Sequence, residues 1–335
     1  MLKRLGILFL VVMIAAIGGA WWMSRRLATP YRGFEAAEVF VEIPRGTSVS
    51  GIARRLADAG VVPDAFTFRI AASMSGAGLG LQAGEYRFAE PASPYDVVAR
   101  IARGDVFVHP ITFREGLTIK EMAPIFEKSG LGTAAEFERA ASDGSLIAAI
   151  DPEARNLEGY LFPETYALPR NAGATGVVRA MVDGFEKAYD AGLRAAATAQ
   201  QMSPREVVTL ASIIEKETGQ AAERPLVAAV YRNRLRIGMA LQCDPTVIYA
   251  LMLARRWNGN LTRQNMQIDS PYNTYRYAGL PPGPIASPGR ASIDAALHPA
   301  DVPYLYFVGK GDGTHAFATT LAEHNVNVRR YQIGR

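Results

Sequence analysis

The first apolar run of the chain shows no alternation with polar positions. Residues 5–23, LGILFLVVMIAAIGGAWWM, carry no charge and end in two tryptophans. A helix of this length covers about 30 Å, the thickness of the hydrocarbon core of a bilayer, and paired tryptophans are typical of the membrane interface. The pattern predicts a transmembrane helix. A cleaved signal peptide is the alternative, because Gly18 and Ala20 form a small-x-small site, but the run is longer than the apolar part of most signal peptides.

The charges that flank this run do not determine its orientation, because basic residues lie on both sides of it. Long domains are translocated largely regardless of charge. We therefore expect residues 1–4 to form a cytoplasmic tail and the bulk of the chain to lie outside the cytoplasm. Residues 24–38 read as a short tether, which keeps the next domain near the bilayer because an extended chain gains only about 3.5 Å per residue.

Beyond the tether, the apolar pattern changes between strand and helix periodicity twice. The segments FVEIPRG and GEYRF have the composition of strands, and two helical patterns separated by Gly60 lie between them. This order predicts a βααβ module over residues 39–105. A shift of 70 residues places Gly116 on Gly46 and Ile119 on Val49. We interpret residues 106–170 as a second, related βαα unit.

Residues 171–335 have longer helical patterns and form the predicted core of a second domain. The segment SPRE at Ser203 supplies a helix cap, a proline in the first turn and a capping box for a helix that carries ASIIEKET. YLYFV and HAFATT, on either side of GKGDGT, predict a hairpin. DSPYNTYRYAGLPPGPIASPG is too rich in Pro and Gly for regular structure, and long ordered loops are usually functional. The fold class is α+β.

Charge and composition exclude several functions. Lys3, Arg4, Arg25 and Arg26 account for the whole net charge of +4, which leaves 32 basic and 32 acidic residues in the rest of the chain. This balance gives no nucleic-acid footprint. The single cysteine, Cys243, permits no intrachain disulfide, and four scattered histidines lack ligand spacing, so we expect no metal site.

The carboxylates of ASIIEKET are the candidate proton donors. On a helical wheel Glu215 lies at one edge of the apolar stripe, and Glu217 lies near the opposite edge, beside Leu210. The two diverge by roughly 200°, so at most one is the acid. Apolar neighbours raise the pKa of a carboxyl group, which favours Glu215 as the catalytic residue. The alternative is that Glu215 forms a structural ion pair with an arginine such as Arg224.

Candidate substrate-binding residues lie in three other segments. They are polar or aromatic side chains on a strand edge, before a helix or on the Pro/Gly-rich loop, where such groups suit sugar rings. For Asp244 the alternative is a helix N-cap, and for Asn273 it is turn capping. The candidates are Glu164, Gln242, Asp244, Tyr272, Asn273 and Tyr275.

Together these segments resemble one family. LEGYLFPETY, ASIIEKET, YRNRL, GMALQCDPTVIYAL, SPYNTY, GLPPGPI, YLYFV and HAFATTLAEHN occur in the order found in endolytic murein transglycosylases of the MltG (YceG-like) type. The resemblance implies a single-pass anchor in the bacterial inner membrane, a LysM-like module over residues 39–105 and a periplasmic catalytic domain. Cys243 departs from the Thr or Ser that is common in relatives.

The resemblance also implies the reaction. It is a non-hydrolytic cleavage of the β-1,4 bond between N-acetylmuramic acid and N-acetylglucosamine in nascent glycan strands, which leaves a 1,6-anhydromuramyl end. Glu215 matches the acid, and we expect it to act first as acid and then as base, without a cofactor. The implied partners are glycan strands, the membrane and peptidoglycan synthases. The alternatives are a glycan-binding scaffold without lytic activity and a hydrolase in which water attacks and Glu223 serves as base.

Overall fold

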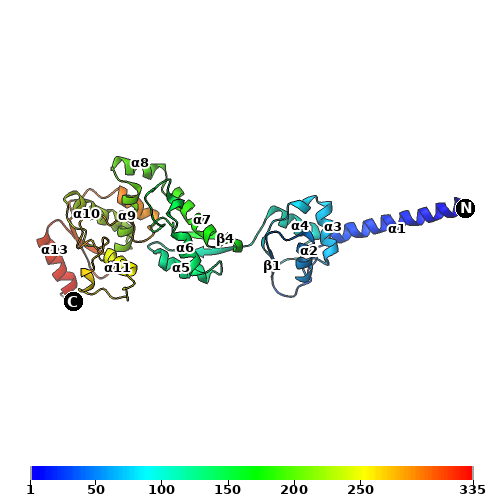
Figure 1. Cartoon of the computed structure of the whole chain (residues 1–335), viewed down its shortest axis with the longest axis horizontal. Helices are drawn as coiled ribbons and strands as arrows, with labels where there is room; N and C mark the ends of the chain where they lie inside the picture. The colour runs from blue at the N-terminus through cyan, green and yellow to red at the C-terminus, as the bar shows by residue number, and fades with distance from the viewer. Residues whose placement is uncertain (1, 334–335) are drawn as a thin grey trace. The chain divides into compact units, whose positions relative to one another are not determined.

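The computed structural model describes residues 2–333, which divide into two compact units (Figure 1). Of the described residues, the first unit contains 2–109 and 168–171, and the second contains 110–167 and 172–333. Helices dominate both units, and every sheet in the described part of the chain has two strands. The predicted α+β class is confirmed.

The first unit follows the predicted strand-helix-helix-strand order. Strand β1 pairs antiparallel with β2, in a register that runs from Val39 opposite Phe88 to Ile43 opposite Gly84. The helices bury apolar stripes that include Ile52 and Phe68 against the inner face of this hairpin. The elements are β1 (Val39–Ile43), α2 (Val49–Asp58), α3 (Ala65–Met74), a short 3-10 turn (Ala77–Leu79), β2 (Gly84–Phe88) and α4 (Pro94–Arg103).

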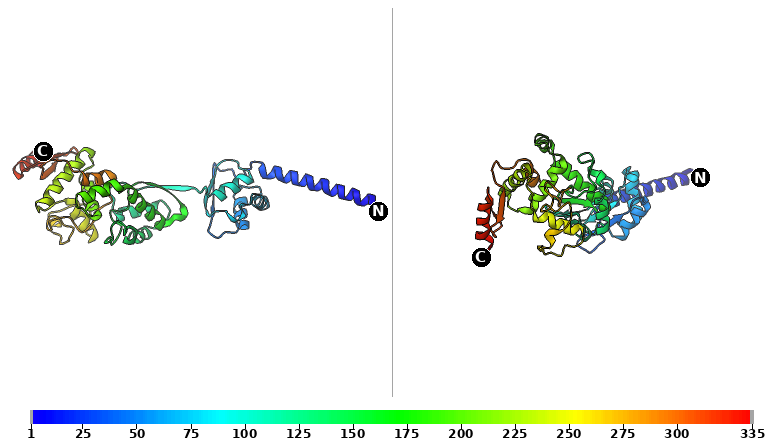
Figure 2. Two further views of the ribbon diagram at one scale, coloured as in Figure 1. Left: turned by 90° about the horizontal axis from the view of Figure 1, so that it is seen from above. Right: turned by 60° about the vertical axis from the view of Figure 1, so that its left-hand side comes forward.

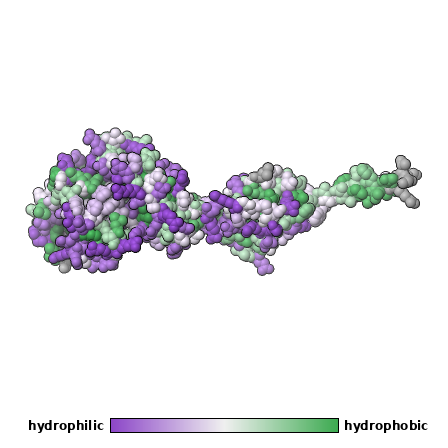
Figure 3. All heavy atoms as spheres, in the orientation of Figure 1, coloured by the Kyte–Doolittle hydropathy of each residue, from purple (hydrophilic) through white to green (hydrophobic). Residues whose placement is uncertain are grey.

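Helix α1 (Leu2–Ala28) is the one helix in the described residues that is long and apolar enough to cross a membrane. Its apolar side chains between residues 5 and 22 are exposed, as the hydropathy colouring of Figure 3 shows. An apolar surface of this length is unfavourable in water and favourable in a bilayer. This helix therefore fits a single-pass membrane anchor near the N-terminus.

The start of the predicted tether is packed against the first unit. Helix α1 continues to Ala28, and Leu27 is fully buried in the core of this unit. Arg26 donates hydrogen bonds to Asp64 Oδ2 (2.6 Å) and Thr67 Oγ1 (3.0 Å). Residues 24–28 therefore continue the anchor helix into the domain, in place of the extended chain that the sequence suggested.

The second unit begins with elements that repeat the pattern of the first. Helices α5 and α6 each start with a capping box, formed by Thr118 with Glu121 and by Thr133 with Glu136. Strand β3 is hydrogen-bonded to β4. These elements are β3 (Val108–Thr112), α5 (Ile119–Lys128), α6 (Ala134–Ala141), a 3-10 turn (Gly144–Ile147), β4 (Thr165–Pro169) and a further turn (Arg170–Ala172).

Helix α9 (Pro204–Glu217) lies at the centre of the remaining elements and contacts α8, α10, α11 and α12. The β5–β6 hairpin contacts α10 and carries α13 on its other side, and both views of Figure 2 show α13 beside the hairpin. The elements are α7 (Gly173–Ala188), α8 (Ala191–Ala199), a 3-10 turn (Ala221–Glu223), α10 (Arg224–Arg236), α11 (Asp244–Leu253), a turn (Asn265–Gln267), α12 (Arg290–Leu297), β5 (Tyr306–Gly309), β6 (His315–Ala318), α13 (Leu321–Val328) and a π-helical turn (Arg329–Ile333).

Candidate active site

Helix α9 delivers two carboxylates at the edge of the second unit's core. The helix starts as predicted, with Ser203 as N-cap, a capping box with Glu206 and proline in the first turn. Its residues from Val207 to Ile214 are all buried. The helix ends at Thr218, whose backbone is extended, so the last turn leaves the core and its side chains diverge.

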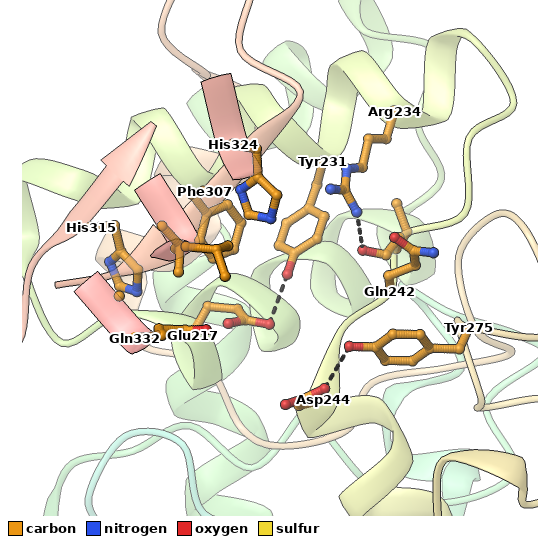
Figure 4. Close-up of a pocket in the computed structure, with 14 residues that line it drawn as sticks. Glu217, Tyr231, Arg234, Gln242, Asp244, Tyr275, Phe307, His315, His324 and Gln332 are labelled. Atoms are coloured by element: carbon orange, nitrogen blue, oxygen red, sulfur yellow. Dashed lines mark hydrogen bonds between the residues drawn. The ribbon is translucent and has the colours of Figure 1, made fainter. Parts of the chain in front are cut away.

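A cavity of about 350 Å³ lies at this end of α9. Its walls come from α9, α10, the segment before α11, the Pro/Gly-rich loop, the β5–β6 hairpin and the C-terminal helical turns (Figure 4). Most of the polar lining groups can donate or accept hydrogen bonds, and the apolar ones are aromatic or branched. The lining residues are Glu217, Tyr231, Arg234, Leu241, Gln242, Asp244, Tyr275, Phe307, Val308, Gly309, His315, His324, Val328 and Gln332.

Glu217 is the carboxyl group of α9 that faces this cavity. Its Oε1 accepts a hydrogen bond of 2.7 Å from the hydroxyl of Tyr231 (Figure 4). Burial raises the pKa of Glu217, and the nearby Asp244 carboxylate raises it further. Hydrogen bonds from Cys243 and Tyr231 act in the opposite direction but do not cancel the effect of burial. The site therefore disfavours the charged form of this carboxyl relative to a carboxyl in water, which suits a general acid.

Glu215 lies outside this cavity and has protein partners on both oxygens. Oε2 accepts hydrogen bonds from the backbone of Gly289 (3.0 Å) and from Ser292 Oγ (2.7 Å). Oε1 lies 3.6 Å from the guanidinium of Arg224, and the Glu215 side chain is only 7% exposed. This environment is the arginine pairing that the sequence offered as the alternative reading. The role of proton donor predicted for Glu215 stays a prediction, and the geometry favours Glu217.

Three of the predicted binding residues do line the cavity. Gln242, Asp244 and Tyr275 lie on one side of Glu217 in Figure 4. The hydroxyl of Tyr275 donates a 2.6 Å hydrogen bond to Asp244 Oδ1. Asp244 is the first residue of α11 and follows the N-cap Cys243, so its carboxylate does not serve as the expected cap.

The other three predicted binding residues lie elsewhere in the second unit. Asn273 is fully buried, and its Nδ2 donates to the carbonyls of Met266 (2.9 Å) and Ile268 (2.8 Å). Tyr272 packs its ring 4.9 Å from that of Tyr249. Glu164 is exposed just before β4. The loop thus uses Asn273 to hold its own backbone together, which is the turn-capping alternative, and presents Tyr275 to the cavity.

His315 lines the cavity and was not predicted from the sequence. Glu223 accepts hydrogen bonds from the backbone N–H of His315 (2.9 Å) and from its ring Nδ1 (2.6 Å). These two contacts lower the pKa of Glu223 despite its burial, and they fix the imidazole at the cavity beside Phe307. No sequence spacing relates residues 223 and 315. The sequence predicted HAFATT as part of a hairpin but did not indicate that its first residue, His315, lines a cavity. Among the described residues, no cluster of three or more His, Cys, Asp or Glu side chains fits a metal ion.

A proton-donating carboxyl in a polar and aromatic cavity defines a candidate acid–base site of the kind found in enzymes that cleave glycosidic bonds. The comparisons with known proteins agree. Residues 41–330 match the family model of the YceG-like family, and the chain belongs to this family. It is 32% identical over 336 residues to an endolytic murein transglycosylase of Bacillus subtilis, covering 94% of this chain and 91% of the relative.

Two further relatives support the assignment. A second endolytic murein transglycosylase, from Streptococcus pneumoniae strain D39, is 28% identical, and the match covers 88% of this chain and 58% of that relative. A crystal structure of a YceG-like protein from Listeria monocytogenes superposes with a TM-score of 0.59 at 32% identity, covering 87% of this chain and 98% of the other.

Proposed function

We propose that the protein is an endolytic peptidoglycan lytic transglycosylase in which Glu217 is the catalytic acid. The activity is carried over from the relatives that bear this name. The observation that supports the choice of Glu217 is its position: it is the α9 carboxyl that lines the cavity, and burial raises its pKa.

The reaction needs only one group that exchanges a proton. The Glu217 carboxyl protonates the oxygen that leaves C1 of N-acetylmuramic acid as the glycosidic bond breaks. The C6 hydroxyl of the same sugar attacks C1 and forms the 1,6-anhydro bond. The Glu217 carboxylate then accepts the proton of the C6 hydroxyl and returns to its starting state. A carboxyl on which burial and hydrogen-bond donors act in opposite directions suits this exchange, because burial favours its neutral form and the donors favour its charged form.

Tyr231 supports both states of the acid. Burial raises the pKa of Tyr231 well above its usual range, so its hydroxyl stays protonated and keeps donating to Glu217 Oε1. Together with the hydrogen bond from Cys243, this contact positions the Glu217 carboxyl at the cavity. General acid–base catalysis of this kind contributes roughly 10²- to 10⁴-fold to a rate.

A hydrolase is the second candidate function, because Asp244 places another carboxylate in the same cavity. Inverting and retaining glycosidases use two carboxyl groups on either side of the bond that is cleaved. The earlier candidate for a base, Glu223, is engaged by His315 on both oxygens and fits the role less well than Asp244. Water attack would leave a reducing end in place of the anhydro end.

The anchor helix α1 gives the enzyme its place in the cell. We extend the proposal to a periplasmic orientation of both units, since the glycan strands lie on that side of the inner membrane. A domain held at the bilayer meets newly made strands first. Peptidoglycan synthases are therefore the expected neighbours.

Paired substitutions test the role of Glu217. Purified full-length protein in detergent is incubated with uncrosslinked glycan strands, and mass spectrometry measures the products. Glu217→Gln should reduce the release of anhydro-ended fragments by about 10²-fold or more while the fold is kept. Glu215→Gln should lower the melting temperature, because it leaves Arg224 without part of its charge compensation, but should keep activity per folded molecule.

Other outcomes of this experiment would contradict the proposed role of Glu217 or the proposed reaction. Anhydro-ended products from Glu217→Gln at the wild-type rate would exclude Glu217 as the acid. Loss of activity in a fully folded Glu215→Gln protein would restore the sequence-based choice. Products heavier by one water would identify a hydrolase, and strand binding without any product would identify a scaffold.

A further inference from the structure

We propose that Gln242 recognises the 2-acetamido group of an amino sugar in the cavity and makes the enzyme selective for N-acetylated strands. This inference rests on the proposed function of the cavity. It assigns to one side chain a specificity for the substrate that goes beyond the proton exchange of the proposed reaction.

The first observation is the backbone of Gln242. Three residues other than glycine have a positive φ in the described part of the chain: Gln201 (55°), Gln242 (51°) and Arg255 (55°). Gln201 and Arg255 directly follow the C-caps of α8 and α11, where the left-handed conformation is common. Gln242 lies in the segment between α10 and α11 and has no such reason for it. Gln242 is the residue before the N-cap of α11, and an unfavourable conformation that no C-terminal helix motif explains points to a functional constraint.

The surrounding contacts hold this conformation in place. The backbone N–H of Gln242 donates to the carbonyl of Thr274 (3.1 Å), and that of Cys243 donates to Thr274 Oγ1 (3.0 Å). Thr246 Oγ1 lies 2.9 Å from the same hydroxyl. A buried threonine of the Pro/Gly-rich loop thus fixes the turn at residues 242 and 243, and Gln242 lines the cavity on the side of Tyr275 and Asp244 (Figure 4).

The second observation is that this side chain is left for a ligand. Gln242 is exposed at the cavity, and its carboxamide makes no hydrogen bond to any described residue. A carboxamide offers a donor and an acceptor side by side, and the group that matches both is another amide. The same cavity also has apolar lining residues, Leu241, Phe307 and Val308, which suit the methyl of an acetamido group. A sugar hydroxyl would satisfy the carboxamide but would leave this apolar part of the cavity unused.

The test compares two strands and two proteins. Uncrosslinked glycan strands are used as isolated or after chemical removal of their N-acetyl groups, and a re-acetylated sample controls for damage. We expect the full-length wild-type protein to cleave the N-acetylated strand at least about tenfold faster. Gln242→Ala should lower the rate on that strand by about tenfold, the effect of one or two neutral hydrogen bonds. It should leave the rate on the de-acetylated strand unchanged, because the interacting partner is already absent.

Two variants make the result independent of folding. Gln242→Gly removes the side chain but suits a positive φ, so its activity loss cannot come from backbone strain. Gln201→Gly makes the same exchange at a helix end and should change neither rate. Equal losses on both strands in the Gln242 variants, or no loss on either, would overturn the proposal. A wild-type protein that makes no anhydro ends on any strand would instead overturn the proposed function.

Discussion

Glu158 is another buried carboxyl group of the second unit, outside the candidate active-site cavity. Its Oε1 accepts a hydrogen bond from the backbone of Ile119 (3.1 Å), and its Oε2 accepts one from the hydroxyl of Tyr249 (3.2 Å). Burial raises its pKa to about 7, and these two donors only partly oppose the shift. No arginine or lysine compensates the charge in the described structure, so Glu158 is a pH-dependent weak point of the fold.

This environment predicts a loss of stability as pH rises. Because the folded pKa lies above the unfolded one, protonated Glu158 stabilises the fold at low pH, and this contribution disappears as pH rises from about 4.5 to about 7. Glu158→Gln keeps an acceptor for Ile119 and carries no charge. Its free energy of unfolding should equal that of wild type at about pH 4 and exceed it by on the order of 3 kcal/mol at about pH 8. Urea denaturation at both pH values measures this difference.

An exposed carboxylate provides the control. Glu164→Gln, on the surface just before β4, should leave the pH dependence of stability as it is in wild type. Parallel stability curves for wild type and Glu158→Gln would contradict the predicted environment of Glu158.

Glu215 and Glu217 show which properties of single residues can be predicted from the sequence. The helical wheel separated Glu215 from Glu217 correctly, since the two have different partners. It did not show which edge of α9 opens to the cavity. The groups that decide this arrive from distant segments: Ser292 from α12 at Glu215, and Tyr231 from α10 at Glu217. Periodicity describes one helix, whereas the chemistry of a carboxyl depends on what faces it.

At the scale of elements, the β5–β6 hairpin depends on one carboxylate for its position. Glu223 binds both the backbone and the ring of His315, the first residue of β6. Phe307 on β5 packs edge-on against that ring at 5.3 Å. Phe307 and His315 both line the cavity, so a change in the position of Glu223 would also change the shape of the cavity wall.

Removal of this contact should loosen the hairpin and reduce activity together. Glu223→Ala leaves the N–H of His315 and its ring nitrogen without a partner, which costs about 1–3 kcal/mol. Hydrogen exchange should speed up in β5 and β6, and cleavage of glycan strands should slow. Glu223→Gln keeps one acceptor and should fall between the alanine variant and wild type.

A substitution in the hairpin turn separates docking from local disorder. Asp312 accepts hydrogen bonds from the backbone N–H and the hydroxyl of Thr314, so Asp312→Ala should speed exchange in the turn and leave His315 protected. Unchanged exchange in β5 and β6 of Glu223→Ala would show that other contacts hold the hairpin.

The boundaries of the elements were predictable where local signals exist. Ser203 with Glu206 marked the start of α9, and glycines at helix ends separated the helices of the first unit. The end of α1 was not predictable. In the sequence, Arg25 and Arg26 have the pattern of polar residues that flank a membrane span. The partner of Arg26 is Asp64, which is distant in the sequence and comes near it only when the first unit folds.

At the scale of the whole molecule, the anchor and the first unit form one piece. Leu27 lies only a turn beyond the interfacial tryptophans, about 8 Å along the helix axis, and is fully buried in the core that contains the β1–β2 hairpin. A membrane anchor that ends inside a domain core restricts how far that domain moves from the bilayer. A flexible tether of the same length would not.

The continuity of α1 predicts how truncated forms of the protein behave. A chain that starts at Met23 keeps Arg26 and Leu27, loses the exposed apolar surface of α1, and should be soluble with the melting temperature of the full-length first unit. A chain that starts at Pro30 loses the buried leucine and the ion pair with Asp64. Since deletion of a buried leucine side chain costs about 2–5 kcal/mol, it should melt several degrees lower. Leu27→Ala in the longer form should reproduce most of this loss, whereas equal melting temperatures for all three proteins would mean that residues 23–29 serve only as a linker.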